Sequence, residues 1–219
     1  MSDEHEFEPI PGLPEKLPQG ERILWQGAPD WRSIALRAYH LKLAGLYLGL
    51  FAAWRLAAGL SDGLGLATVL ADVAWLAIPA ALGGGLIVLL AWLTAKATVY
   101  TITDRRVVMR FGMALPMVVN LPFRIVSAAG MKLYRDGTAD LPLTLSGRDR
   151  ISYLALWPHA RPWRLRNPEP MLRAVPDGPR VTQILASALA AAAGKPAPRF
   201  EADPAPAPAA AAARAAGVS

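Results

Sequence analysis

Two long apolar runs lie close together in the first half of the chain. The first covers residues 41–60 and carries Lys42 and Arg55 as its only charged side chains, whereas the second covers residues 73–93 and carries none. A helix of about 20 apolar residues is long enough to cross the hydrocarbon core of a bilayer. The pattern therefore predicts a transmembrane helical hairpin over residues 33–95. The alternative is that both runs are buried helices in the core of a soluble protein.

The hydrophobic pattern changes its period after the second run. Residues 98–103 and 107–111 are rich in β-branched and apolar side chains, and the Asp-Arg pair between them is typical of a turn, so we expect a β-hairpin there. An Asp-Gly pair at residues 136–137 is the strongest hairpin signal in the chain. We expect further short strands over residues 115–121, 125–134, 139–145 and 151–157.

Helical periodicity returns near the end of the chain. Apolar residues recur at helical spacing over residues 181–193, with Pro179 before them and Gly194 after them as start and stop signals. A helical turn is also expected within residues 167–174. The sequence thus predicts an α+β membrane protein, in which an antiparallel β domain over residues 96–194 follows the hairpin and is capped by a C-terminal helix.

The remaining segments are polar or of low complexity. Residues 1–32 form a polar leader with several prolines and a short extended segment just before the membrane, and residues 33–40 are expected to form an interfacial helix. Residues 195–219 are rich in Ala and Pro, and we expect them to be disordered.

The distribution of basic residues predicts an orientation in the membrane. Lys and Arg flank both apolar runs, whereas residues 61–72 between the runs contain two Asp and no Lys or Arg. Basic loops stay on the cytoplasmic side, so we expect a multi-pass protein of the cytoplasmic membrane with both termini in the cytoplasm. The first 20 residues lack the features of a signal peptide, which leaves the first run to act as its own insertion signal.

The composition excludes several classes of chemistry. The chain has no Cys, so disulfides and thiolate ligands are excluded, and its three His lie far apart in sequence. No nucleophile, phosphate-loop or zinc-protease motif is present. The formal net charge of +6 is too dispersed for a nucleic-acid module. We therefore expect no catalytic residue, no metal, no cofactor and no enzymatic activity.

Two segments are candidates for contact with protein partners. Gly83, Gly84 and Gly85 interrupt the second apolar run, where small residues allow helices to approach closely in lipid, although they can instead simply add flexibility. The segment WPHARPW carries Trp157, Arg161 and Trp163, and Arg with aromatic residues is typical of protein interfaces. The alternative for this segment is a packed loop.

Other charged residues have two interpretations each. Arg105, Arg106 and Arg110 lie on and beside the first β-hairpin and are candidates for contact with anionic lipid headgroups, or else belong to a solvated turn. Arg55 and Asp72 lie nearest to the apolar core, where they are expected either to reach the interface or pair with each other, or to contact a partner.

These features resemble a known family. The motif GERILWQG at residues 20–27, an apolar hairpin and the motif YTITDRRVV at residues 100–108 resemble bacterial membrane proteins with a PH-like domain. Within that group, the chain is similar to the PuhB family of photosynthetic-complex assembly proteins from purple bacteria. The motifs that carry this likeness lie at residues 7–15, 23–31, 37–40, 121–125, 157–163 and 167–170.

The resemblance implies a function. It predicts a non-enzymatic assembly factor for the photosynthetic reaction centre and core light-harvesting complex, in which the protein binds nascent subunits as a membrane scaffold. The resemblance also implies self-association, for which a homodimer is the candidate. The resemblance supplies no catalytic or binding residue. A lipid-headgroup-binding PH-like membrane protein and a pigment-handling protein remain alternatives.

Overall fold

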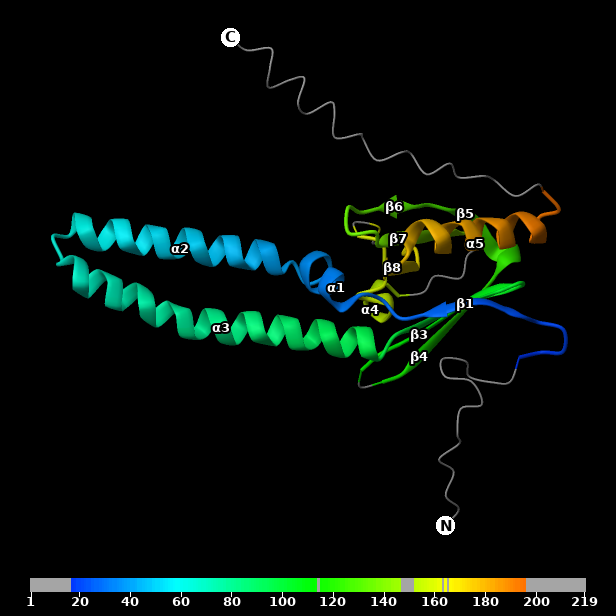
Figure 1. Cartoon of the computed structure of the whole chain (residues 1–219), viewed down its shortest axis with the longest axis horizontal. Coiled ribbons are helices and arrows are strands. Elements are labelled where there is room, and N and C mark those ends of the chain that lie inside the picture. Colours follow the sequence, from blue (N-terminus) through cyan, green and yellow to red (C-terminus); the bar gives the residue numbers. More distant parts are fainter. Residues whose placement is uncertain (1–16, 114, 147–151, 163, 165, 196–219) are drawn as a thin grey trace, which may run out of the picture.

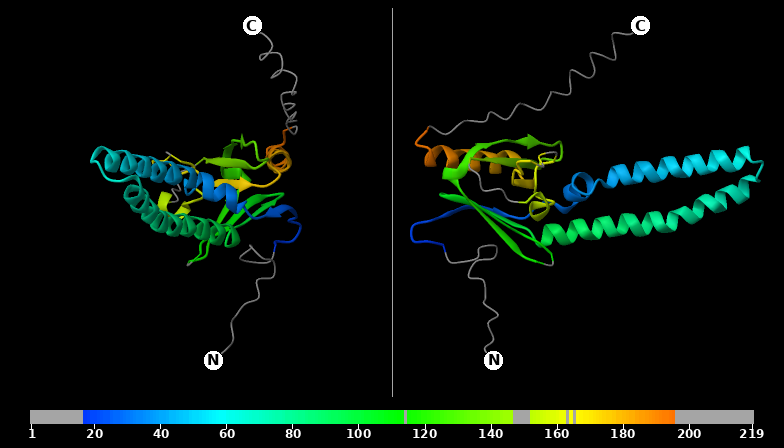
Figure 2. Two further views of the ribbon diagram at one scale, coloured as in Figure 1. Left: turned by 60° about the vertical axis from the view of Figure 1, so that its left-hand side comes forward. Right: turned by 180° about the vertical axis from the view of Figure 1, so that it is seen from behind.

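A long helical hairpin projects from one end of a β domain (Figure 1). The computed structural model describes residues 17–113, 115–146, 152–162, 164 and 166–195. Two further views show that the hairpin leaves the domain at a single end (Figure 2).

The hairpin consists of helices α2 (Leu41–Ser61) and α3 (Leu66–Lys96). Both helices are long and apolar enough to cross a membrane, and almost none of their apolar surface is buried within the chain. The alternative of two buried helices in a soluble core is therefore wrong, because such helices would be covered by the rest of the protein. Helix α3 has 31 residues and begins seven residues before the predicted run. At about 1.5 Å per residue it exceeds the hydrocarbon core, so its last turns reach the domain.

The first sheet contains a strand from each side of the hairpin. Strands β1 (Ile23–Gly27), β2 (Val99–Thr103), β3 (Arg106–Phe111) and β4 (Met117–Pro122) form an antiparallel sheet in this order. The predicted β-hairpin is β2–β3. The sequence places the residues of β1 in a leader outside the domain, but β1 pairs with β2 through the register Gln26↔Thr101. The β domain is therefore assembled from both sides of the hairpin.

The second sheet packs over the first. Strand β7 (Ala139–Leu145) pairs with β5 (Val126–Ala129), with the two-residue β6 (Lys132–Leu133) and with β8 (Met171–Val175). The 3₁₀ helix η1 (Phe123–Ile125) leads from β4 into β5. Helix α5 (Gly178–Ala192) is the predicted C-terminal helix of the domain, although it begins three residues earlier than predicted.

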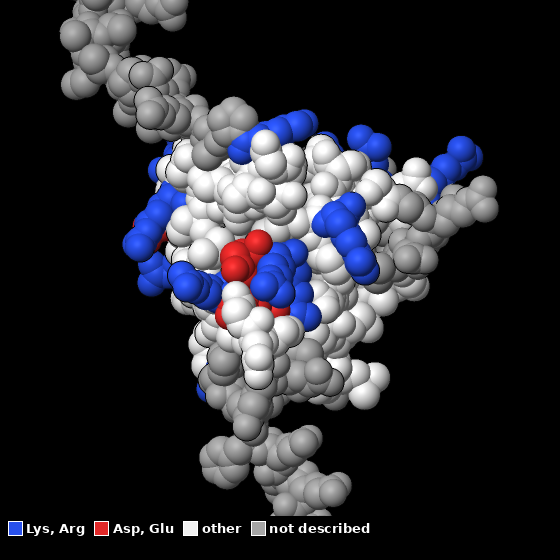
Figure 3. All heavy atoms as spheres, turned by 90° about the vertical axis from the view of Figure 1, so that its right-hand side faces the viewer, with Lys and Arg blue, Asp and Glu red and all other residues white. Residues whose placement is uncertain are grey.

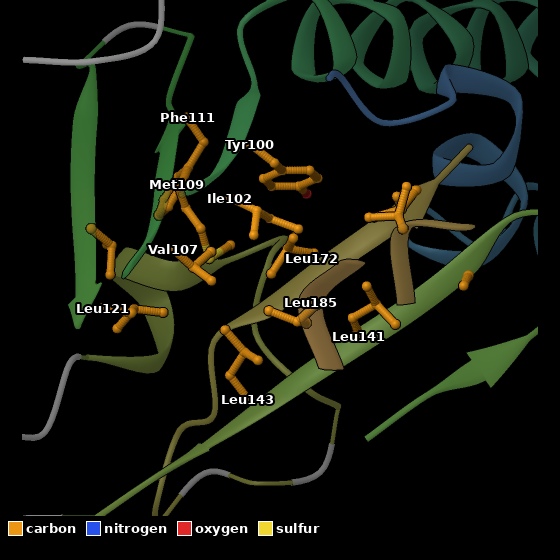
Figure 4. Packing of buried hydrophobic residues seen from close by; sticks show 14 of the residues in the cluster. Tyr100, Ile102, Val107, Met109, Phe111, Leu121, Leu141, Leu143, Leu172 and Leu185 are labelled. Carbon is orange, nitrogen blue, oxygen red and sulfur yellow. The ribbon is translucent and has the colours of Figure 1, made fainter. Parts of the chain in front are cut away.

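The core lies between the two sheets and α5. Figure 4 shows side chains of the first sheet, including Tyr100, Ile102 and Met109, directed toward Leu141 of the second sheet and Leu185 of α5. All five side chains are almost completely buried. Two antiparallel sheets closed by a C-terminal helix are the arrangement of a PH-like domain, so the predicted α+β architecture of a helical hairpin followed by such a domain is confirmed.

Two predicted elements are wrong. The run at residues 151–157 is not a strand: Ile151 lies outside the described residues, and a short helix α4 (Tyr153–Leu156) follows. Leu156 is buried while Leu154 is 84% exposed, which is a helical rather than a two-residue period. The expected helical turn before Ala174 is strand β8, whose five residues are all buried. The expected helical turn rests on Pro170, which suits the first position of a helix, but pairing of the following residues with β7 outweighs this preference.

Candidate functional site at the junction of hairpin and domain

A short helix fastens the hairpin to the domain. Helix α1 (Trp31–Arg37) begins at Asp30, whose Oδ2 accepts a hydrogen bond of 2.8 Å from the N–H of Ser33. Its Ile34 and Ala35 are buried against the end of α3. The predicted short helix is present as α1, and one of its faces packs against the protein while Arg32 and Leu36 stay exposed, so its interfacial position stays a prediction. The buried residues of this contact are Ile34, Ala35, Ala38, Ala91, Ala95 and Ala174.

A chain of buried polar groups continues from α3 into the core. The hydroxyl of Thr98 donates to the carbonyl of Thr94 in α3 (2.7 Å), and it lies 3.2 Å from Nε2 of His159. Nδ1 of His159 lies 2.6 Å from the hydroxyl of Tyr100. That hydroxyl also accepts the backbone N–H of Arg173 in β8 (3.1 Å). The end of α3 is thereby connected to both sheets.

These contacts define the protonation state of His159. Since the Tyr100 oxygen accepts from Arg173, its single proton is free to be donated to Nδ1, and Nε2–H then donates to Thr98. A neutral imidazole satisfies every member of the chain. Burial, with a smaller contribution from the charge of Arg173, lowers the pKa of His159 to about 3. His159 is therefore a neutral imidazole that has a structural role and carries no positive charge near pH 7.

A second polar cluster fastens α1 to the turn between β6 and β7. Nη2 of Arg37 donates to the hydroxyls of Ser33 and Thr138 (both 2.7 Å) and to the carboxylate of Asp136. The guanidinium also lies 3.6 Å from the ring centroid of Tyr134. Burial alone would raise the pKa of Asp136, but hydrogen bonds from Thr138 and Ser33 and the charge of Arg37 outweigh it and lower the pKa to about 2.

A cavity opens beside this cluster. It has a volume of about 850 Å³ and lies between α1, the β6–β7 region, α4 and β8. Its charged lining side chains are Arg37, Lys132, Asp140, Arg161 and Arg173. Asp140 is fully engaged, because it accepts hydrogen bonds from the Tyr134 hydroxyl and from the backbone N–H of Ala174 (2.8 Å each). The cavity is thus lined mainly by cationic groups.

The comparison with protein families agrees with this geometry. Residues 35–189, more than half of the chain, match the family described as Bacterial PH domain. The chain belongs to this family. The match spans both the helical hairpin and most of the β domain, so in this bacterial PH domain protein the hairpin lies within the family's own segment.

A relative of this bacterial PH domain protein is known in Rhodobacter capsulatus. It is named as an uncharacterized 23.7 kDa protein in the puhA 5′ region and is 40% identical over 200 residues, which cover 90% of this chain and 92% of the relative. No solved structure matches the chain.

The structure describes two of the three predicted interface residues of the WPHARPW segment, Trp157 and Arg161, and places them in different surroundings. The ring of Trp157 is 48% exposed and meets Tyr39 edge-on, with ring centroids 5.4 Å apart. Arg161 is held by the buried carboxylate of Glu169 (2.7 Å). Trp163 lies outside the described residues. Pro158, His159 and Ala160 between them are buried, so the segment combines a packed centre with an exposed aromatic edge beside the hairpin.

The three predicted lipid-contact residues do not form one cluster in this PH domain protein. Arg105 and Arg106 follow the end of β2 that is remote from α3, whereas Arg110 pairs across the ladder with Val99 at the near end. Arg106 is also bound through two hydrogen bonds (2.8 and 3.0 Å) to the buried carboxylate of Glu21. Figure 3 looks onto this remote end, where Lys and Arg side chains surround a small group of Asp and Glu. Arg105 and Arg106 therefore lie at the end of the domain opposite to the apolar hairpin, which argues against their contact with a membrane that the hairpin would cross.

The glycine triplet and the charges of the hairpin occupy different surroundings. A Cβ added at Gly83, Gly84 or Gly85 would meet nothing within 4 Å, so none of the described residues packs there and the partner-contact prediction stays a prediction. Arg55 and Asp72 pair with each other (3.6 Å), as one of the two interpretations expected.

Among the described residues, no group of His, Asp or Glu comes together that could hold a metal ion.

The sequence analysis missed several residues of the hairpin and of its junction with the domain. Gly59 is the position of close helix approach, because a Cβ there would lie 2.8 Å from Cγ2 of Val69. His159 and Tyr100 are the centre of the buried chain, although 59 residues separate them. No local sequence pattern indicates that two residues so far apart in the chain are in contact, so the pair becomes visible only in the structure.

Proposed function

We propose that this protein is a non-enzymatic assembly factor for the photosynthetic reaction centre and its core light-harvesting complex. The observation that carries the proposal is the relative named for its place in the puhA 5′ region, which is similar to this chain along nearly its whole length. The resemblance to the PuhB family points in the same direction. In this proposal the protein is a scaffold that binds nascent subunits, and no residue acts on a substrate.

We further propose that α2 and α3 cross the cytoplasmic membrane and that both termini lie in the cytoplasm. The length and exposure of the two helices support the spanning, and the basic residues on both sides of the hairpin support the orientation. The PH-like domain would then be held at the cytoplasmic surface in a fixed orientation relative to the hairpin. Helix α1 and the hydrogen bonds of His159 attach it to α3. A fixed direction is useful to a scaffold that presents one edge to a nascent subunit.

The exposed aromatic edge beside the hairpin is the proposed contact. Trp157 is exposed and packs on Tyr39, which in turn lies 2.9 Å from Thr94 of α3 through its hydroxyl. Exposed Trp residues are frequent anchors of protein interfaces. The glycine triplet of α3 offers a second surface, at the level of the bilayer, for subunit helices or for a second copy of this chain.

The test is a mild-detergent pull-down of the tagged full-length protein from its phototrophically grown host. Reaction-centre or antenna subunits in the eluate are the expected result, and bound bacteriochlorophyll would shift the proposal toward pigment handling. An eluate that holds only this protein and lipid would contradict the assembly role.

A variant pair sharpens the test. Trp157→Ala combined with Trp163→Ala is expected to lower the yield of assembled complexes while the protein accumulates normally. Leu24→Ala, which removes another exposed apolar side chain on β1, is the matched control and should leave the yield unchanged. Equal yields in the two variants would remove the aromatic edge from the mechanism.

A further inference from the structure

We propose that the cavity between α1, β6–β7 and β8 is a binding site for an anionic phosphoryl group. This inference does not rest on the assembly role. The cavity was described above by its volume of about 850 Å³ and its cationic lining, and none of the predicted lipid-contact residues belongs to it.

The first observation is a buried guanidinium that lacks a carboxylate. Arg173 is 8% exposed, and Nη1 donates to the carbonyl of Pro158 (2.8 Å), but Nε is buried without a partner. No ion pair joins Arg173 to an Asp or Glu among the described residues. Burying a charge is costly unless a counter-charge and hydrogen bonds compensate it. The side chain is therefore poised for an anion that enters the cavity it lines.

The second observation is that two further cations converge on the same cavity. Both contact the ring of Tyr134: the guanidinium of Arg37 lies 3.6 Å from its centroid and the ammonium of Lys132 lies 5.2 Å from it. Lys132 has no carboxylate partner among the described residues, and Nη1 of Arg37 is buried without a hydrogen-bond partner. Like charges gathered in this way repel each other, and a shared anion would relieve the repulsion.

The balance of charge at the cavity favours an anion. Of its lining residues four are Lys or Arg and one is Asp. Arg37 and Arg161 are already paired with Asp136 and Glu169, which lie outside the lining, and Asp140 is engaged by two donors. The two donors to Asp140 are neutral and leave its charge in place, so Lys132, Arg173 and Asp140 together give the cavity one net positive charge. A guanidinium beside an ammonium suits the several oxygens of a phosphoryl group, since Arg binds such oxygens in pairs and Lys acts as a point charge.

The position of the cavity indicates where such a group can come from. His40, which immediately precedes α2, lines it together with Leu36 of α1. The cavity thus lies where the hairpin meets the domain, at the level that a phospholipid headgroup would occupy if α2 crosses a bilayer. Free phosphate in solution presents the same chemistry, so the experiment has to separate these two sources.

The experiment uses the detergent-purified full-length protein. Native mass spectrometry with added phosphatidylglycerol or phosphatidylcholine tests the lipid source, and thermal shift in inorganic phosphate against chloride at equal ionic strength tests the free anion. We expect the phosphatidylglycerol adduct to be retained at least about tenfold more than the phosphatidylcholine adduct, in line with a charge-assisted pair of contacts. A phosphate-induced stabilisation without a phosphatidylglycerol preference would assign the site to the free anion instead, which also supports the proposal.

Two variants and one control decide whether this cavity is responsible. Lys132→Ala, at an exposed position that the fold tolerates, should reduce the preference about tenfold, and Arg173→Lys should reduce it while keeping the buried charge. Arg124→Ala removes the same charge from η1, which lies outside the cavity, and should leave binding unchanged. Absence of both lipid preference and phosphate stabilisation would overturn the proposal, as would an equal loss in Arg124→Ala and Lys132→Ala.

Discussion

The hydroxyl of Tyr100 lies 2.6 Å from Nδ1 of His159, and both side chains are completely buried. Tyr100 belongs to the strand that leaves the hairpin, and His159 belongs to the segment that carries the exposed Trp157. Their contact joins the part of the chain that follows the apolar hairpin to the proposed partner edge. The pair therefore helps to fix the orientation of the domain relative to α3.

Tyr100→Phe should destabilise the domain. The variant removes the donor to His159 and the acceptor of the Arg173 N–H, so two buried polar groups lose their partner. A buried group without its partner costs about 1–3 kcal/mol. Thermal unfolding of the solubilised protein should show a midpoint lower by several degrees. Tyr47→Phe, on the exposed face of α2, is the matched control and should unfold like the parent protein.

The stability of the domain should fall as the pH drops below about 6.5. The pKa of His159 is about 3 in the folded protein, against 6.5 for an ordinary histidine, so the unfolded chain binds a proton between these values and the folded protein does not. Stability is then fully present above the unfolded pKa and declines with acidification. At pH 5 the loss is on the order of 2 kcal/mol.

Urea unfolding of the solubilised protein between pH 7 and pH 5 measures this slope. In His159→Gln the slope should be smaller, although the variant is less stable at every pH. His40→Asn, which changes an exposed histidine, should keep the slope of the parent protein. An unchanged slope in His159→Gln would mean that other groups titrate with unfolding.

Local patterns in the sequence were sufficient for much of the fold. The apolar runs, the turn at Asp104-Arg105 and the helix after Pro179 all depend on neighbours within a few positions, and the structure confirms them. The run at residues 151–157 was misassigned, because a short apolar stretch fits a helix and a strand equally well.

Long-range pairing could not be predicted in the same way. Strand β1 pairs with β2 across the whole hairpin, with Gly27 opposite Tyr100, and the leader carried no sign of its partner. The cavity was invisible for the same reason, since Arg37, Lys132 and Arg173 meet only when three elements pack together. The candidate residues that the sequence did provide were chosen for their type, and type alone does not tell whether an arginine such as Arg106 is already bound by a carboxylate.

Asp136→Asn should loosen α1 from the domain. The carboxylate accepts hydrogen bonds from Ser33 of α1 and from Thr138, and it pairs with Arg37. Its side chain is 47% exposed, so we expect a modest loss of about 1 kcal/mol. Hydrogen exchange should become faster in α1 and stay unchanged in the first sheet. The pKa of about 2, lowered from 3.8, means that the parent protein keeps this contact above pH 4 and loses it as the pH falls toward 2.

Gly59 and the glycine triplet of α3 should respond differently to a bulky side chain. Gly59→Leu forces a side chain into Val69, where even a Cβ would lie 2.8 Å from Cγ2, so the solubilised hairpin should unfold at a lower temperature. Gly84→Leu meets open space and should leave the unfolding temperature unchanged. If the triplet is a seam for a second copy or a subunit helix, Gly84→Leu should nevertheless reduce cross-linking in the membrane, because small residues set how closely helices approach. Unchanged cross-linking together with unchanged stability would show that the triplet contacts no helix, and it would leave the aromatic edge around Trp157 as the proposed contact.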